Sequence, residues 1–136
     1  MARKRVKGCK PRALAMVICE MVTRDEATKN VCLLGLFNRL SAPGLPMVHG
    51  RLHVFVSLTD GHGKQPFCLQ CRAPDESVVF EAKGEMAFED PLSVADLNIE
   101  IRCLMFEVPG NYVFEFYCGG ELLTMRRFSV VVEKQP

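Results

Sequence analysis

The fold is decided by the stretch Tyr112-Val-Phe-Glu-Phe-Tyr-Cys-Gly-Gly-Glu121 and the residues that follow it. Aromatic residues occupy every second position from Tyr112 to Phe116, a period typical of a strand that buries one face. Gly119 and Gly120 are both free to adopt a positive φ, as the tight type I′ turn of a hairpin requires. The sequence therefore predicts an antiparallel hairpin whose second strand runs from Leu122 to Val132.

The same period of two recurs over Val48–Thr59 and again over Asn98–Phe106. In the first of these segments, one predicted face carries Leu52, Val54, Val56 and Leu58, and the other carries His49, Arg51, His53, Phe55 and Ser57. This alternation predicts a half-buried antiparallel strand. The turn residues Asp60–Pro66 then predict a hairpin connection to a return strand over Phe67–Arg72. A further strand is expected over Ser77–Lys83, followed by a looser segment, Gly84–Pro91.

Two apolar runs near the N-terminus, Leu14–Met21 and Val31–Phe37, flank a polar stretch. We interpret them as a hairpin that ends before the breaker cluster Ser41–Pro46. A helix over Ala13–Ala27 is the alternative, because periodicity does not separate a short buried strand from a buried helical segment.

Together these segments give eight or nine strands with turn signals at intervals typical of a sandwich, and no parallel strand–helix–strand rhythm. The expected fold class is all-β, an antiparallel two-sheet β-sandwich. A chain of 136 residues with 49% hydrophobic and 24% charged residues is long enough for one globular domain, which we place at residues 13–136. The apolar runs fall well short of the roughly 20 residues of a membrane-spanning helix.

The charges are unevenly distributed although the net charge is only +1. Residues 1–12 form a predicted basic arm without a single acidic residue, and its cations are Arg3, Lys4, Arg5, Lys7, Lys10 and Arg12. Such an arm binds nucleic acid or another anion in some proteins and is simply solvated in many others. The apolar run Ala13–Cys19 that follows this arm lacks a convincing signal-peptide cleavage site, so we expect a cytoplasmic protein.

Several of these segments also resemble a known family. The resemblance is carried by Met16–Thr23, Val31–Leu40 and Val108–Phe116, followed by Gly120 and Phe128–Val130. It is a resemblance to small uncharacterised bacterial proteins that are grouped as a domain of unknown function. It implies a β-sandwich in a bacterial, intracellular protein, and it carries no active site to transfer.

The seven cysteines are odd in number and mostly lie in apolar segments, which favours free thiols in a reducing compartment over a disulfide scaffold. We expect Cys19, Cys32, Cys103 and Cys118 to be buried. Cys68 and Cys71 have the spacing of a metal-binding or redox pair, with His62 as a candidate third ligand. The favoured interpretation is two unrelated cysteines, since positions i and i+3 of a strand face opposite sides.

The remaining candidates are weaker. His49 and His53 lie about 13 Å apart if Val48–Thr59 is a strand, too far to share one ion. Asp60–Lys64 lacks the pattern of a phosphate-binding loop. The acidic residues in Glu85–Asp90 and Asp75–Glu76 follow no calcium-loop pattern and are expected to be solvated.

No cofactor is predicted, and no recognisable catalytic motif is present, although a triad dispersed along the chain is compatible with the sequence. The leading hypothesis is a non-enzymatic binding module that contacts another protein through its exposed edge strands, with self-association as a further expectation. The alternatives are anion or nucleic-acid binding through the basic arm and a small metal-dependent protein that uses Cys68 and Cys71.

Overall fold

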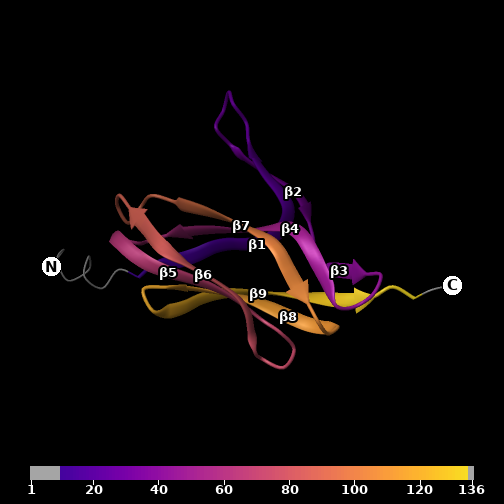
Figure 1. Cartoon of the computed structure of the whole chain (residues 1–136). Coiled ribbons are helices and arrows are strands. Elements are labelled where there is room, and N and C mark those ends of the chain that lie inside the picture. Colours follow the sequence, from indigo (N-terminus) through magenta and orange to yellow (C-terminus); the bar gives the residue numbers. More distant parts are fainter. Residues whose placement is uncertain (1–9, 135–136) are drawn as a thin grey trace.

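The computed structural model describes residues 10–134, and within them the chain forms nine strands and no helix. The strands are β1 (Arg12–Arg24), β2 (Val31–Leu36), β3 (Arg39–Ala42), β4 (Met47–Thr59), β5 (Gly63–Arg72), β6 (Val78–Phe88), β7 (Ala95–Phe106), β8 (Gly110–Cys118) and β9 (Glu121–Val132). They form a four-stranded sheet in the order β2-β1-β4-β7 and a five-stranded sheet in the order β3-β9-β8-β5-β6 (Figure 1). The predicted all-β sandwich is confirmed. In the described range, no helix could cross a membrane.

Both predicted terminal hairpins are present. β8 and β9 pair antiparallel through a turn in which Gly119 and Gly120 have φ values of 62° and 84°. β1 and β2 also pair antiparallel, so the helical alternative for Ala13–Ala27 is wrong. This N-terminal hairpin projects from the body of the sandwich (Figure 1).

Two predicted details of the topology are wrong. β4 and β5 do not form a hairpin: β4 belongs to the four-stranded sheet, whereas β5 pairs with β6 and β8 in the other sheet. A short turn looks the same in sequence whether it joins paired strands or crosses between sheets. The breaker cluster also hides a strand, because Ser41 and Ala42 belong to β3, which pairs with β9 in parallel.

β4 is more buried than predicted. Leu52, Val54, Val56 and Leu58 point into the core as expected, but His53 and Phe55 on the other face are only 7% and 8% exposed. β4 is a central strand between β1 and β7, so neighbouring side chains cover it on its outer face as well. Phe55 also lines a cavity with Val22 and Val31 of the projecting hairpin.

The alternation of β7 shifts by one residue at Cys103. Ile101 is buried, as are Leu104 and Phe106, whereas Met105 is 47% exposed. Cys103 has a φ of 56°, which is unusual for a residue other than glycine. The backbone turns there, so the strict period of two predicted for Asn98–Phe106 does not continue through it.

The core between the sheets is dominated by aromatic side chains from β7, β8 and β9. Phe106 meets Tyr112 edge-on with ring centroids 5.0 Å apart, and Phe114 stacks on Phe128 at 5.4 Å. The Tyr112 hydroxyl is satisfied because it donates a hydrogen bond of 2.7 Å to the Val108 carbonyl. β8, whose alternating aromatic residues predicted the hairpin, is therefore also at the centre of the core.

The six cysteines in the described range are free thiols. Cys19 and Cys118 are buried as predicted, but Cys32 and Cys103 are exposed, so the prediction for those two is wrong. Cys32 lies in the projecting hairpin and Cys103 lies at the irregular position of β7, and neither place contributes to the core.

Candidate binding surface

One lateral side of the sandwich has two free strand edges. β6 is the last strand of the five-stranded sheet and pairs only with β5, and β7 is the last strand of the four-stranded sheet and pairs only with β4. The two strands contact each other where the sheets meet, and both contribute to the lining of two cavities, one near each end of this side. We call this surface the β6–β7 side.

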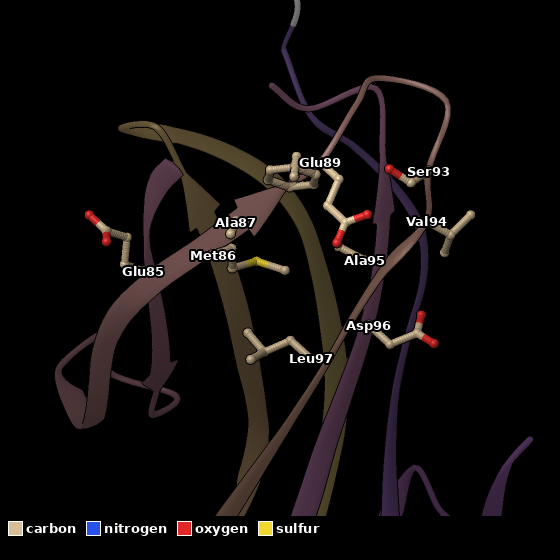
Figure 2. Close-up of a pocket in the computed structure, with 10 residues that line it drawn as sticks. Glu85, Met86, Ala87, Glu89, Ser93, Val94, Ala95, Asp96 and Leu97 are labelled. Carbon is tan, nitrogen blue, oxygen red and sulfur yellow. The ribbon is translucent and has the colours of Figure 1, made fainter. Parts of the chain in front are cut away.

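The larger cavity has a volume of about 490 Å³ and opens between the end of β6 and the start of β7. It is lined by residues 85–89 and 93–97 (Figure 2). Met86 and Leu97 face each other across the opening and form its apolar floor (Figure 2). Met86 is 6% exposed, so the cavity reaches the edge of the core.

The walls of this cavity are fixed by contacts to the end of β4. The Thr59 hydroxyl donates a hydrogen bond of 3.1 Å to the Ser93 carbonyl, and the Asp60 amide donates one of 2.9 Å to the Pro91 carbonyl. Gly61 lies so close to Phe88 that an added methyl group would lie 2.5 Å from its ring. The loop between β6 and β7 is therefore tied to the body of the sandwich at the mouth of the cavity.

The charged groups in the lining are all acidic. They are Glu85, Glu89 and Asp96, and the lining contains no lysine, arginine or histidine. Glu85 and Glu89 form no ion pair within residues 10–134, and Asp96 accepts a 2.7 Å hydrogen bond from the Ser57 hydroxyl. Figure 2 shows Glu85 and Asp96 pointing away from the opening on its two flanks, with the Glu89 side chain between the strands.

A second cavity of about 260 Å³ lies at the opposite end of the same side, where Val79 of β6 approaches Met105 of β7. Its charged lining residues, Asp75 and Glu107, are acidic as well. Two hydrogen bonds from Ser77 to the Asp75 carboxylate, of 2.6 and 3.0 Å, hold the pKa of Asp75 below its ordinary value. Both ends of the β6–β7 side thus combine apolar and carboxylate groups.

Exposed apolar side chains also gather on this part of the chain. Leu92 and Val94, in the loop beside the larger cavity, are 89% and 55% exposed. The other large hydrophobic residues that are exposed between Val78 and Val108 are Val78, Val79, Met105 and Val108. Exposed apolar side chains thus lie at both ends of the β6–β7 side.

The structure does not bring the candidate metal ligands together. Cys71 is fully buried in the core, and burial raises its pKa from 9.0 to about 12. Cys68 lies on the opposite face of β5, where its Sγ is 3.7 Å from Glu81 Oε2, and His62 lies exposed in the turn before β5. Within the described residues, no group of three or more histidine, cysteine or acidic side chains has the arrangement of a metal site.

His53 belongs to a different cluster, on the outer face of the four-stranded sheet. Its Nδ1 forms a 3.0 Å hydrogen bond with Asn98 Oδ1, and its Nε2 lies 3.8 Å from Glu100 Oε2. Cys19 is its register neighbour on β1, which gives a cysteine, a histidine and an asparagine in adjacent strands. Cys19 has no exposed surface, and burial raises its pKa, so this thiol is poorly suited to act as a nucleophile. His49 packs against Phe37 instead, with ring centroids 6.3 Å apart.

The basic arm is described only at its end. Arg3, Lys4, Arg5 and Lys7 lie outside the described residues. Lys10 Nζ pairs with Glu121 Oε1 at 2.8 Å, and Arg12, the first residue of β1, pairs with Asp60. Both side chains therefore hold the start of β1 to neighbouring strand ends.

The carboxylates of the β6–β7 side were visible in the sequence only as acidic loop positions, expected to be solvated. Glu85 belongs to β6, and Glu89 directly follows it, because β6 continues to Phe88 through the segment predicted to be loose. The alternation of Met86 and Phe88 with Glu85, Ala87 and Glu89 was the available signal. Its significance depends on β7 lying opposite, and local sequence does not show that neighbour.

The fold and this surface define an all-β sandwich with one open, acidic side. The chain belongs to a family of unknown function, DUF6941, whose sequence profile matches residues 14–131, and this confirms the resemblance noted above. The comparison with curated proteins gives no match.

Two solved structures are similar in fold. One is the alkylpurine DNA glycosylase AlkC of Pseudomonas fluorescens bound to DNA with an abasic-site analogue, with 8% identity, a TM-score of 0.49, and coverage of 90% of this chain but 30% of the glycosylase chain. The other is an immunoglobulin-like protein from Pseudomonas aeruginosa, with 14% identity, a TM-score of 0.46, and coverage of 89% of this chain and 96% of that one. This chain thus corresponds to about a third of the glycosylase chain.

Proposed function

We propose that this protein is a non-enzymatic binding module that holds an extended segment of a partner protein along the β6–β7 side. The observation that carries the proposal is the pair of free strand edges beside an open cavity with an apolar floor. A free edge offers unpaired backbone N–H and C=O groups to an incoming strand, and adjacent pockets select its side chains. The surface therefore supplies both parts of recognition by strand addition.

The length of β7 supports this assignment. β7 has 12 residues, and at a rise of about 3.3 Å per residue its regular part before Cys103, residues 95–102, gives a free edge of roughly 26 Å. The other terminal strands of the two sheets are shorter, since β2 has 6 residues and β3 has 4. β2 also lies on the projecting hairpin (Figure 1), away from the core. The β6–β7 side therefore combines a long terminal strand with a cavity.

Free thiols at all six described cysteines are typical of a reducing compartment, and they support our expectation that the protein acts in the cytoplasm.

Self-association through the β6–β7 side would compete with a partner. The mass of the protein under non-denaturing conditions, measured with and without peptide, separates these two uses of the edge.

Peptide selection provides the test. Twelve-residue peptides are selected from a random displayed library against the full chain, and their binding is localised by amide hydrogen exchange. We expect slower exchange in β6 and β7 and no change in β2 or β3. Selected peptides that slow exchange only at β2 or β3 contradict the proposal.

Two matched substitutions make this test specific. Val94 lines the larger cavity and is 55% exposed, whereas Val132, at the end of β9, is 44% exposed and lines neither cavity of the β6–β7 side. Val94→Trp should obstruct the cavity and weaken peptide binding by about tenfold, the scale of a residue at the centre of an interface. Val132→Trp should leave the affinity within about twofold. Equal effects of the two substitutions count against this site.

A further inference from the structure

The charge of the β6–β7 side points to the chemical class of its partner. We propose, on the basis of the function proposed above, that the bound segment is basic, with lysine or arginine alternating with apolar residues along an extended strand. The partner is thus a protein with an exposed cationic segment, and not a nucleic acid, because a carboxylate surface repels phosphate groups.

The first argument is the concentration of negative charge. The whole chain has 17 basic and 16 acidic residues, yet the segment from Ala73 to Val108 contains nine acidic residues and two basic ones. This segment comprises β6, β7 and the turns beside them. A nearly neutral protein therefore concentrates its acidic residues on β6, β7 and the turns beside these strands.

The second argument is that neither cation of these strands offsets the carboxylates of the cavity. Lys83 lies 3.8 Å from Glu81, and Arg102 lies 3.2 Å from Glu100, so both cations pair with acidic residues of their own strands. Glu85 and Glu89 form no ion pair within the described part of the chain. These carboxylates are available to a cation from outside.

The third argument is the alternation of apolar and acidic groups around the opening. Successive side chains of an extended strand point to opposite sides. A strand laid along this edge can direct apolar side chains toward Met86 and Leu97, and the intervening cations toward the carboxylates on the flanks (Figure 2). The spacing of a strand thus fits both chemical features of the surface.

The experiment uses three labelled nine-residue peptides with blocked ends. In the first, lysine alternates with valine, and in the others threonine or glutamate replaces each lysine. Affinity for the full chain is measured by fluorescence anisotropy, and the binding site is located by amide hydrogen exchange. We expect the lysine peptide to bind at least about tenfold more tightly than the threonine peptide and to slow exchange in β6 and β7. Raising the NaCl concentration from 0.05 to 0.5 M should strongly weaken the binding of the lysine peptide, since the Debye length falls about threefold.

Matched triple variants separate a local effect from overall charge. Glu85→Gln, Glu89→Gln and Asp96→Asn remove the carboxylates of the cavity, whereas Glu20→Gln, Glu26→Gln and Glu133→Gln remove three exposed carboxylates elsewhere. The net charge changes equally in both. Each exposed ion pair contributes about two- to fivefold to the affinity. The first variant should therefore bind the lysine peptide roughly tenfold or more weakly, and the affinity of the control variant for this peptide should change little.

The outcomes distinguish this inference from the proposed function. Equal weakening by both triple variants means non-specific attraction and overturns the inference. If the threonine peptide binds as tightly as the lysine peptide and slows exchange in β6 and β7, strand addition stands and the basic class is wrong. If β6 and β7 exchange slowly through self-association without any peptide, the occupant is a second copy, which also overturns the inference. If no peptide affects β6 or β7, both proposals fail.

Discussion

At the residue scale, Cys103 is the most informative single position. It is an exposed residue in the left-handed region, with φ of 56°, and it divides β7 into two parts with opposite alternation. The period of two predicted for Asn98–Phe106 would place Ile101, Cys103 and Met105 on one face, because such a period cannot reveal where the alternation of a strand changes. A positive φ at a cysteine has no signature in the sequence. Only the structure therefore reveals that Leu104 and Phe106 are buried and that Met105 is exposed.

The strain at Cys103 gives a testable consequence. Cys103→Gly should leave the free energy of unfolding unchanged or raise it by up to about 1 kcal/mol, because glycine adopts positive φ without steric cost. Cys32→Gly is the matched control, since Cys32 is also an exposed strand cysteine but has no positive φ. It should lower the free energy of unfolding by about 0.5–1 kcal/mol. Urea denaturation checks both, and equal losses in the two variants would show that Cys103 is not strained.

Cys71 predicts an alkaline sensitivity. Burial raises its pKa from 9.0 to about 12, so the unfolded chain loses this proton at lower pH than the folded protein does. Its contribution to stability is fully present below about pH 9 and is lost as the pH rises toward 12. The associated slope is at most about 1.4 kcal/mol per pH unit. Replacing Cys71 by alanine should reduce the alkaline slope of the free energy of unfolding relative to the unsubstituted protein. An unchanged slope in this variant would contradict the effect assigned to the burial of Cys71.

At the scale of elements, the two strands and the turn of the β8–β9 hairpin were predicted because they are contiguous in sequence, but the register irregularity between Phe116 and Tyr117 was not. Tyr112, Phe114 and Phe116 are all buried, and both turn glycines have positive φ. The connection from β4 to β5 was predicted wrongly, since its turn residues do not specify whether the next strand stays in the same sheet. Local sequence signals therefore identified the strands well. They identified which strands pair with each other only where the paired strand is the next one along the chain.

The hairpin turn can be tested with a pair of glycine substitutions. Gly120 has a φ of 84° and open space around it, so Gly120→Ala should lower the free energy of unfolding by about 1–2 kcal/mol through backbone strain alone. Gly50 in β4 also has open space but no positive φ. Gly50→Ala should have no cost and should stabilise the protein by up to about 1 kcal/mol. Thermal unfolding compares them, and a Gly120→Ala protein as stable as the original would contradict the assigned turn.

At the scale of the whole molecule, the two-sheet architecture followed from the number and spacing of the strands, but the candidate site did not. Glu85, Glu89 and Asp96 are close in sequence, but they line one cavity only because the last strands of two different sheets lie along one side. The cysteine pair that local spacing did suggest is divided between the two faces of β5. Binding surfaces formed between sheets thus depend on tertiary neighbours that a single sequence does not display.

We propose that a partner strand adds along the β6–β7 side. The most direct measurement is amide hydrogen exchange of the full chain, alone and saturated with a peptide selected for binding. The account predicts that amides in β6 and β7 exchange more slowly in the complex, because an added strand pairs with these free edges, while β2 and β3 stay unchanged. Slower exchange confined to β2, β3 or the β1–β2 hairpin would contradict the account.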